Sequence, residues 1–96
     1  MRQTFIVSYD VSHPRRLRKV FKLMRGYGDH LQLSVFRCEL TARELFELRG
    51  KIGAIIEREE DQVLFVDVGP SEGRGRGSIS AMGKPYTHPD RHAVVV

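Results

Sequence analysis

The stretch Thr4-Phe5-Ile6-Val7-Ser8-Tyr9-Asp10-Val11-Ser12-His13-Pro14 decides the fold, because it passes from a strand directly into a helix. Side chains alternate along the predicted strand, so that Phe5, Val7 and Tyr9 lie on one face. Asp10 belongs to the opposite face and comes at the carboxyl end of the strand, where the chain turns. The sequence therefore places a carboxylate at the end of its first strand.

A helix is expected directly after this turn. Ser12 or His13 lies at the N-cap, and Pro14 suits the first helical position, where its missing N–H is not needed. The apolar stripe that marks its buried face is Leu17, Val20, Phe21 and Met24. Gly26 or Gly28 is expected to end the helix in the left-handed conformation.

The rest of the chain predicts further strands and a second helix. Residues 31–40 form a second strand, and Thr41 with Glu44 makes the capping box that begins the second helix. The apolar stripe of that helix is Leu45, Leu48, Ile52 and Ile55. Residues 62–68 are almost continuously apolar, which favours a third strand at the centre of the sheet. Residues 78–82 form a short fourth strand.

This order predicts one α+β domain over residues 1–96, with the ferredoxin-like βαββαβ arrangement. Its antiparallel sheet carries both helices on one face, with an extra C-terminal strand or tail. The glycine- and arginine-rich segment 71–77 is expected to be a flexible loop. The tail, residues 87–96, ends in three valines, which we expect to pair with a sheet edge, either of its own chain or of a partner subunit.

Positive charge is concentrated in the first helix. The chain carries a net charge of +4, and six cations follow one another there without an acid between them: Arg15, Arg16, Arg18, Lys19, Lys22 and Arg25. The acids collect later, at residues 57–61. Like charges one turn apart repel each other, so a phosphate backbone is the natural partner of such a face. The alternative is a solvated basic face, and Arg74 with Arg76 adds either phosphate contacts or solubilising charge.

Several classes of protein are excluded by composition. A single cysteine, Cys38, rules out an internal disulfide framework, a cysteine-based zinc site and an iron–sulfur cluster. No apolar run is long enough to cross a membrane, and residues 1–7 lack the features of a signal peptide. We therefore expect a cytoplasmic protein without membrane contact.

Four segments together resemble the CRISPR-associated endoribonuclease two family. They are Ser8-Tyr9-Asp10-Val11-Ser12, the arginine-rich helix 15–25, Tyr27-Gly28, and the segment 32–40 with its Ser34-Val35-Phe36 motif. The resemblance implies a ferredoxin-like homodimer with Mg²⁺-dependent (or Mn²⁺-dependent) endonuclease activity on RNA or double-stranded DNA. It also implies partnership with the integrase that acquires spacers in antiviral defence. The likeness fades beyond the third strand.

The resemblance also assigns roles to residues. It implies that Asp10 binds the metal, with Tyr9 beside it in the catalytic site. The residues expected to bind nucleic acid are Arg15, Arg16, Arg18, Lys19, Lys22 and Ser34. Two positions depart from the family's pattern, since His30 stands where many members carry arginine and Arg37 where many carry glutamate.

Each assignment has a plainer alternative. Asp10 may serve only to cap the turn, Phe36 belongs either to the core or to a dimer interface, and Ser34 is either a satisfied strand hydroxyl or a phosphate contact. His13 lies close enough in sequence to assist Asp10. One carboxylate cannot hold Mg²⁺ alone, so a site requires Asp10 from each of two subunits. The functional alternative to an endonuclease is a non-catalytic dimer that binds DNA and bridges copies of the integrase.

Overall fold

The computed structural model describes residues 1–85, without the side chains of residues 74 and 76. Its elements are β1 (Gln3–Asp10), α1 (Pro14–Arg25), β2 (Gly28–Gln32), β3 (Val35–Leu40), α2 (Ala42–Gly53), β4 (Gln62–Pro70) and α3 (Arg74–Gly77). The predicted tail over residues 87–96, with its contact to a partner, lies outside the described residues. Within the described part, no helix is long and apolar enough to span a membrane.

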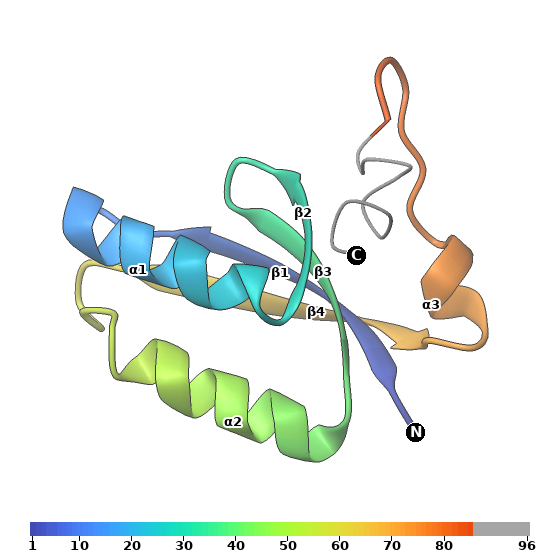
Figure 1. Cartoon of the computed structure of the whole chain (residues 1–96), viewed down its shortest axis with the longest axis horizontal. Coiled ribbons are helices and arrows are strands. Elements are labelled where there is room, and N and C mark those ends of the chain that lie inside the picture. The colour runs from blue at the N-terminus through green and yellow to red at the C-terminus, as the bar shows by residue number, and fades with distance from the viewer. Residues whose placement is uncertain (86–96) are drawn as a thin grey trace.

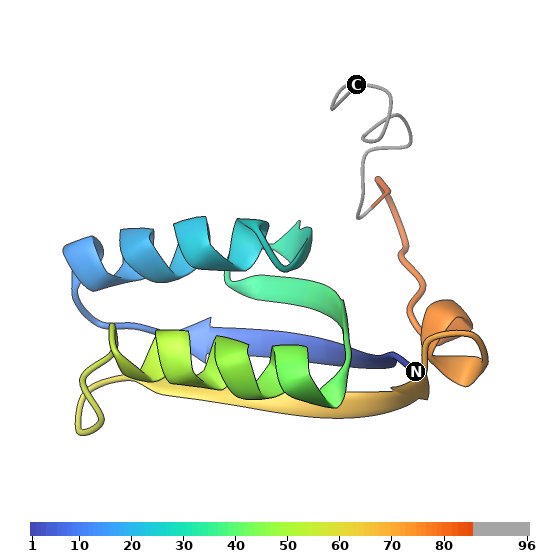
Figure 2. The ribbon, with the colours of Figure 1, turned by 60° about the horizontal axis from the view of Figure 1, so that its bottom comes forward.

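The four strands form one antiparallel sheet in the order β2-β3-β1-β4. Figure 1 shows α1 and α2 in front of the sheet, and Figure 2 shows both helices on the same face. This confirms the ferredoxin-like βαββαβ arrangement. The central position of residues 62–68 was wrong, because β4 lies at the edge and β1 lies between two neighbours. The apolar run in β4 instead leaves Leu64 and Val66 each 50% exposed on the face without helices.

The core lies between the sheet and the two helices. Alternation along β1 places Phe5, Val7 and Tyr9 in this core, as predicted, and leaves Asp10 exposed. The helices and β3 contribute the remaining large side chains, which include Val20, Met24, Phe36, Cys38, Leu40, Leu48 and Ile52. Burial raises the pKa of the Cys38 thiol to about 12, with a smaller contribution from Asp29.

Both helices begin as the sequence predicts. His13 is the N-cap of α1, and its ring nitrogen Nδ1 accepts a hydrogen bond from the Arg15 N–H at 3.1 Å. Thr41 and Glu44 form the complete capping box of α2. The left-handed end of α1 was wrong: Gly26 caps the helix with φ −81°. The chain does not reverse there, since its next N–H groups bond back onto the last helical turn before β2 starts.

Two strand predictions need correction. The predicted strand 31–40 is a hairpin, in which β2 and β3 pair across the turn at Leu33 and Ser34. The predicted strand 78–82 is not a strand, because these residues pair with no neighbour among the described strands.

The segment 71–77, expected to be a loop, contains the short helix α3. Figure 1 places α3 beside the amino-terminal end of β1. There the buried hydroxyls of Thr4 and Ser71 hydrogen-bond at 2.8 Å. A Cβ at Gly75 would lie 2.8 Å from both Gly69 O and Thr4 Oγ1, so only glycine allows this approach. The helix is therefore anchored on the sheet, and the flexibility of this segment stays a prediction.

Candidate functional site at the carboxyl end of β1

Asp10 ends β1 with an exposed side chain. Its register partner is Gln62, the first residue of β4. No hydrogen bond or ion pair to the Asp10 carboxylate is made by any residue of the described part of the chain. An exposed carboxylate at a strand end is thus available to a ligand from outside the chain.

The alternative role of Asp10, capping the turn before α1, is excluded by the geometry of that turn. The helix cap is His13, which uses its ring nitrogen for this purpose. The turn itself is held by Asp61, whose Oδ1 accepts hydrogen bonds from the Ser12 N–H at 2.9 Å and the Ser12 hydroxyl at 3.2 Å. Both structural tasks that would explain an aspartate at position 10 are therefore carried out by other residues.

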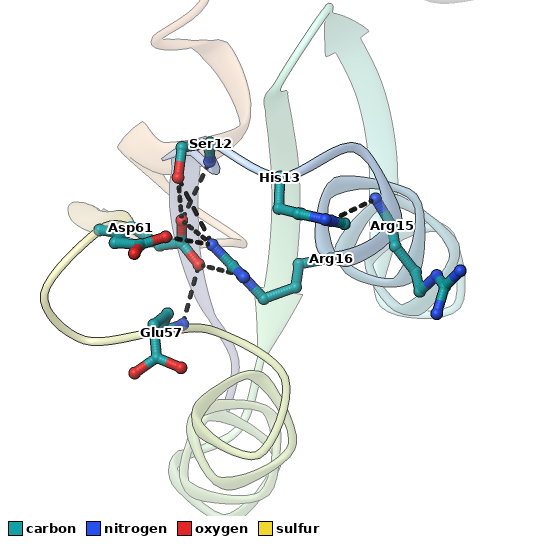
Figure 3. Close-up of polar contacts among 7 residues, drawn as sticks. Ser12, His13, Arg15, Arg16, Glu57 and Asp61 are labelled. Carbon is teal, nitrogen blue, oxygen red and sulfur yellow. Dashed lines mark hydrogen bonds and ion pairs between the residues drawn. The ribbon is translucent and has the colours of Figure 1, made fainter.

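Asp61 is the centre of a polar network that sequence reasoning missed (Figure 3). Its side chain is fully buried, and it receives Arg16 Nε on Oδ2 at 2.8 Å and Arg16 Nη2 on Oδ1 at 3.2 Å. Oδ2 also accepts the Glu57 N–H at 2.8 Å. The carboxylate thus joins the β1–α1 turn, the first turn of α1 and the loop that leads into β4. We name Asp61, Arg16 and Ser12 the Asp61 cluster.

Charge assistance within this cluster is strong. The Arg16 guanidinium, with smaller contributions from the Glu57 and Ser12 N–H groups, holds the pKa of Asp61 far below its ordinary value, against the opposing effect of burial. In turn, Asp61 and to a lesser degree Glu60 raise the pKa of Arg16. Charged bidentate pairs of this kind are stronger and more directional than neutral hydrogen bonds.

Tyr9 faces the core, on the side of the strand opposite to Asp10. Its ring stacks on Phe36 with centroids 6.3 Å apart, and its N–H donates to the Ser34 carbonyl at 3.0 Å. Burial raises the pKa of Tyr9, and the nearby Ser34 side chain offsets part of that rise. No hydrogen bond of ordinary geometry reaches the buried hydroxyl from residues 1–85. Tyr9 therefore connects the end of β1 to the β2–β3 turn.

Phe36, expected at a subunit interface, is instead fully buried in the core of its own chain. Its ring also contacts His30, with centroids 4.9 Å apart, and Phe21, with centroids 5.7 Å apart. The structure thus supports the core alternative. His30 is exposed at the rim of this aromatic group and its Nε2 lies 2.9 Å from the Leu33 carbonyl oxygen.

The cations of α1 fall into two groups. Those at positions 15, 18, 19 and 22 are exposed and make no ion pair within residues 1–85: Arg15, Arg18, Lys19 and Lys22. Arg16 differs, because its side chain is only 22% exposed and it pairs with Asp61 and Glu60. The acid-free appearance of the helix sequence is therefore true of four of its predicted phosphate contacts and not of Arg16. Ser34 lies half-buried at the β2–β3 turn.

The donor set fits a divalent cation only in part. Among the described residues, no three His, Cys, Asp or Glu side chains come close enough to hold a metal ion. One chain offers the unengaged carboxylate of Asp10, whereas Mg²⁺ is commonly bound by one or two carboxylates together with water and phosphate oxygens. A second carboxylate would have to come from a second chain.

A family model described as "CRISPR associated protein Cas2" matches residues 3–73 of the chain. The chain belongs to the Cas2 family. A relative from Geobacter sulfurreducens, called CRISPR-associated endoribonuclease Cas2, is 41% identical over 96 residues and covers 100% of both chains. A second, from Rhodospirillum rubrum and called CRISPR-associated endoribonuclease Cas2 1, is 37% identical over 92 residues, which is 96% of this chain and 89% of the relative.

Solved structures agree with this membership. The crystal structure of Streptococcus pyogenes Cas2 matches with a TM-score of 0.73 and 30% identity, over 83% of this chain and 99% of that one. The resemblance seen in the sequence is thereby confirmed, and so is the fold expected from it. Cas2 membership places Asp10, at the end of the first strand, in the part of the chain that the family model covers.

Proposed function

We propose that this Cas2 protein is a homodimeric, metal-dependent endonuclease that hydrolyses phosphodiester bonds of RNA or DNA during spacer acquisition in antiviral defence. The observation that carries the proposal is the exposed Asp10 carboxylate. It has no structural partner within the described chain and lies where β1 ends, next to the start of a basic helix. The names of the relatives, which call them endoribonucleases, favour RNA as the first substrate to test.

The requirement for two chains follows from the single free carboxylate and from the uncovered sheet face. On that face Leu64 and Val66 are half exposed, and Val66 lies opposite Ile6 in register. Such an apolar face on a sheet is suited to contact with another protein surface. A two-fold axis near the end of β1 would bring two copies of Asp10 together.

In the proposed site, Asp10 of each protomer would hold Mg²⁺ or Mn²⁺. When bound, such an ion supplies electrostatic stabilisation of the charge that develops on the phosphate. The exposed cations of α1 would bind the backbone phosphates on either side and fix the position of the scissile bond. Tyr9 would act from below the site, because its packing on Phe36 and its bond to Ser34 fix the direction of the strand that carries Asp10.

A second function is favoured by one observation: the exposed cations of α1 do not depend on Asp10 for their placement. A dimer could therefore bind double-stranded DNA without cutting it and bridge two copies of the adaptation integrase. Both functions use the same basic helices, and they differ only in whether Asp10 is needed.

The two functions are separated by a cleavage assay. The parent protein and Asp10→Ala are incubated with labelled RNA and with duplex DNA, in Mg²⁺, in Mn²⁺ or in a chelator. The endonuclease proposal expects cleavage by the parent only with metal, and loss of at least about 100-fold in Asp10→Ala, since the metal's electrostatic contribution would be removed. Nucleic-acid binding should remain in the variant.

Glu72→Ala provides the matched control, because Glu72 is an exposed acid near the opposite end of the sheet. It should cleave as the parent does. Binding of DNA and of the integrase without cleavage of any substrate would favour the adaptor. Equal cleavage by the parent and Asp10→Ala would contradict the endonuclease site.

A further inference from the structure

We propose that Arg16 is a positioning residue, held by Asp61 to fix the strand end that carries Asp10, and that the exposed cations of α1 contact phosphate in its place. This inference rests on the proposed function, because it divides the basic residues of that site into two roles. It changes the role expected of Arg16 from its sequence, which places it among the nucleic-acid contacts.

The first argument is the geometry of the Arg16 side chain. Nε donates to Asp61 Oδ2 at 2.8 Å, and Nη2 donates to Asp61 Oδ1 at 3.2 Å and to Glu60 Oε1 at 3.0 Å. Nη2 also lies 3.4 Å from the Ser12 hydroxyl. To bind a phosphate through these nitrogens, Arg16 would have to leave a fully buried carboxylate without its charged partner. Such a loss is costly in a protein interior.

The second argument is local charge. Arg16 contributes one positive charge, while Asp61 and Glu60 beside it contribute two negative charges. The cluster around Arg16 is therefore net negative and does not attract phosphate. Arg15 and Arg18, on the same helix, are exposed and have no acidic partner within residues 1–85. The attraction for phosphate belongs to these neighbours.

The third argument is what the Asp61 cluster holds. Ser12, two residues after Asp10, donates both its N–H and its hydroxyl to Asp61. Asp61 itself immediately precedes Gln62, the register partner of Asp10. One carboxylate thus fastens the chain on both sides of the Asp10–Gln62 pair. Loss of its bonds would change the direction in which Asp10 points, and an error of about 1 Å can reduce a rate by roughly 100-fold.

The first test compares Arg16→Gln with Arg18→Gln, which each remove one cation from α1. The affinity of each variant for duplex DNA is measured over a series of salt concentrations. Arg18→Gln should make the log–log slope shallower by about 0.9, the value for one lost phosphate contact. Arg16→Gln should leave the slope unchanged. A slope reduced equally by both variants would overturn the proposal.

The second test separates positioning from charge through the cleavage kinetics of Arg16→Lys and Asp61→Asn. Lysine keeps the charge but lacks the planar fork that engages both carboxylate oxygens. Both variants should lower kcat roughly 10- to 100-fold with KM close to that of the parent. Glu60→Gln is the control, because it removes the exposed partner of the same arginine, and its kcat should stay near that of the parent. Full activity of Arg16→Lys would show that only its charge matters.

A measurement on the unmodified protein covers variants that fail to fold. The Nε–H resonance of Arg16 should keep its NMR chemical shift when duplex DNA is added, while that of Arg18 moves. A shift of the Arg16 resonance as large as that of Arg18 would overturn the inference. A parent that binds DNA but never cleaves would instead defeat the endonuclease proposal, and the slope and NMR comparisons would still decide the role of Arg16.

Discussion

Two aspartates beside one turn, Asp10 and Asp61, have opposite surroundings. Asp61 is buried and satisfied by five hydrogen bonds from Ser12, Arg16 and Glu57. Asp10 is exposed and has no partner in the described chain. Because the first supplies the order of the turn, the second is released from any structural task, as a residue intended for a ligand would be.

The lowered pKa of Asp61 makes stability depend on pH. In the unfolded chain this carboxyl returns to its ordinary value of 3.8, so the unfolded state takes up a proton more readily than the folded one. The contribution of Asp61 is therefore complete above about pH 4 and is lost as the pH falls further. Glu44, whose pKa is lowered chiefly by the Thr41 N–H, acts in the same direction.

We therefore expect the melting temperature of the parent to fall between about pH 5 and pH 2. Asp61→Asn should melt at a lower temperature than the parent at neutral pH and show a shallower fall, because only part of the acid-sensitive stability remains. Circular dichroism melts over this pH series provide the measurement, with Glu72→Gln as the control. A fall as steep in Asp61→Asn as in the parent would contradict the assignment.

The Asp61 cluster also shows where sequence reasoning ends. The basic run of α1 and the acids at residues 57–61 are both plain in the sequence, but they looked like separate regions. Arg16 and Asp61 are 45 positions apart, and nothing local selects which cation meets which acid. The position of Asp10 was predictable, because it depends only on strand alternation. The partner of Arg16 depends on how the whole sheet closes.

At the scale of elements, strands and helices were predicted wherever local chemistry carried the signal. Pro14 after His13 marked the start of α1, and the Thr41–Glu44 pair marked the start of α2. The β2–β3 hairpin was missed because its turn, Leu33-Ser34, contains none of the residues that usually signal a turn. Leu33 also continues the apolar alternation, although it is 90% exposed. A pattern that runs unbroken through a turn cannot reveal it.

Two glycines in different elements should respond to alanine in opposite directions. At Gly28, in β2, a Cβ would lie 2.3 Å from the Arg37 carbonyl oxygen and 2.6 Å from Cys38 Sγ. The obstacle includes rigid backbone, so Gly28→Ala should destabilise the fold by about 1–3 kcal/mol. At Gly50, inside α2, nothing lies within 4 Å of the added Cβ. Gly50→Ala should stabilise by about 0.4–1 kcal/mol, because alanine favours the helix.

Urea unfolding of both variants and the parent checks this pair of signs. Each variant adds the same methyl group, so the comparison removes the effect of the substitution itself. Stabilisation by Gly28→Ala would mean that β2 does not approach β3 as closely as described. Destabilisation by Gly50→Ala would mean that this face of α2 is covered.

At the scale of the whole molecule, the helices cover one face of the sheet and leave the other with apolar side chains (Figure 2). Part of that second face is flanked by residues 79–84, which line a pocket together with Ile6 and Val35. Leu64 and Val66 on the edge strand remain half exposed. We therefore expect a second copy of the chain on this face, in agreement with the proposed function.

Val66→Lys tests this arrangement. A charge on an apolar interface is poorly tolerated, so the variant should sediment as a single chain while the parent sediments as a dimer. Phe46→Lys is the control, because Phe46 is 78% exposed on α2, on the helical side of the molecule. It should remain dimeric. A monomeric parent, or a dimeric Val66→Lys, would contradict the use of this face.

The burial of Cys38 has a practical use. Its sulfur lies in the core, and its pKa of about 12 leaves almost no thiolate at neutral pH, so maleimide reagents have little to react with in the folded chain. Since this is the single cysteine of the sequence, a second one placed at an exposed position such as Glu72 would take up a fluorophore or spin label selectively. Labels at that position on two subunits would then report their separation directly.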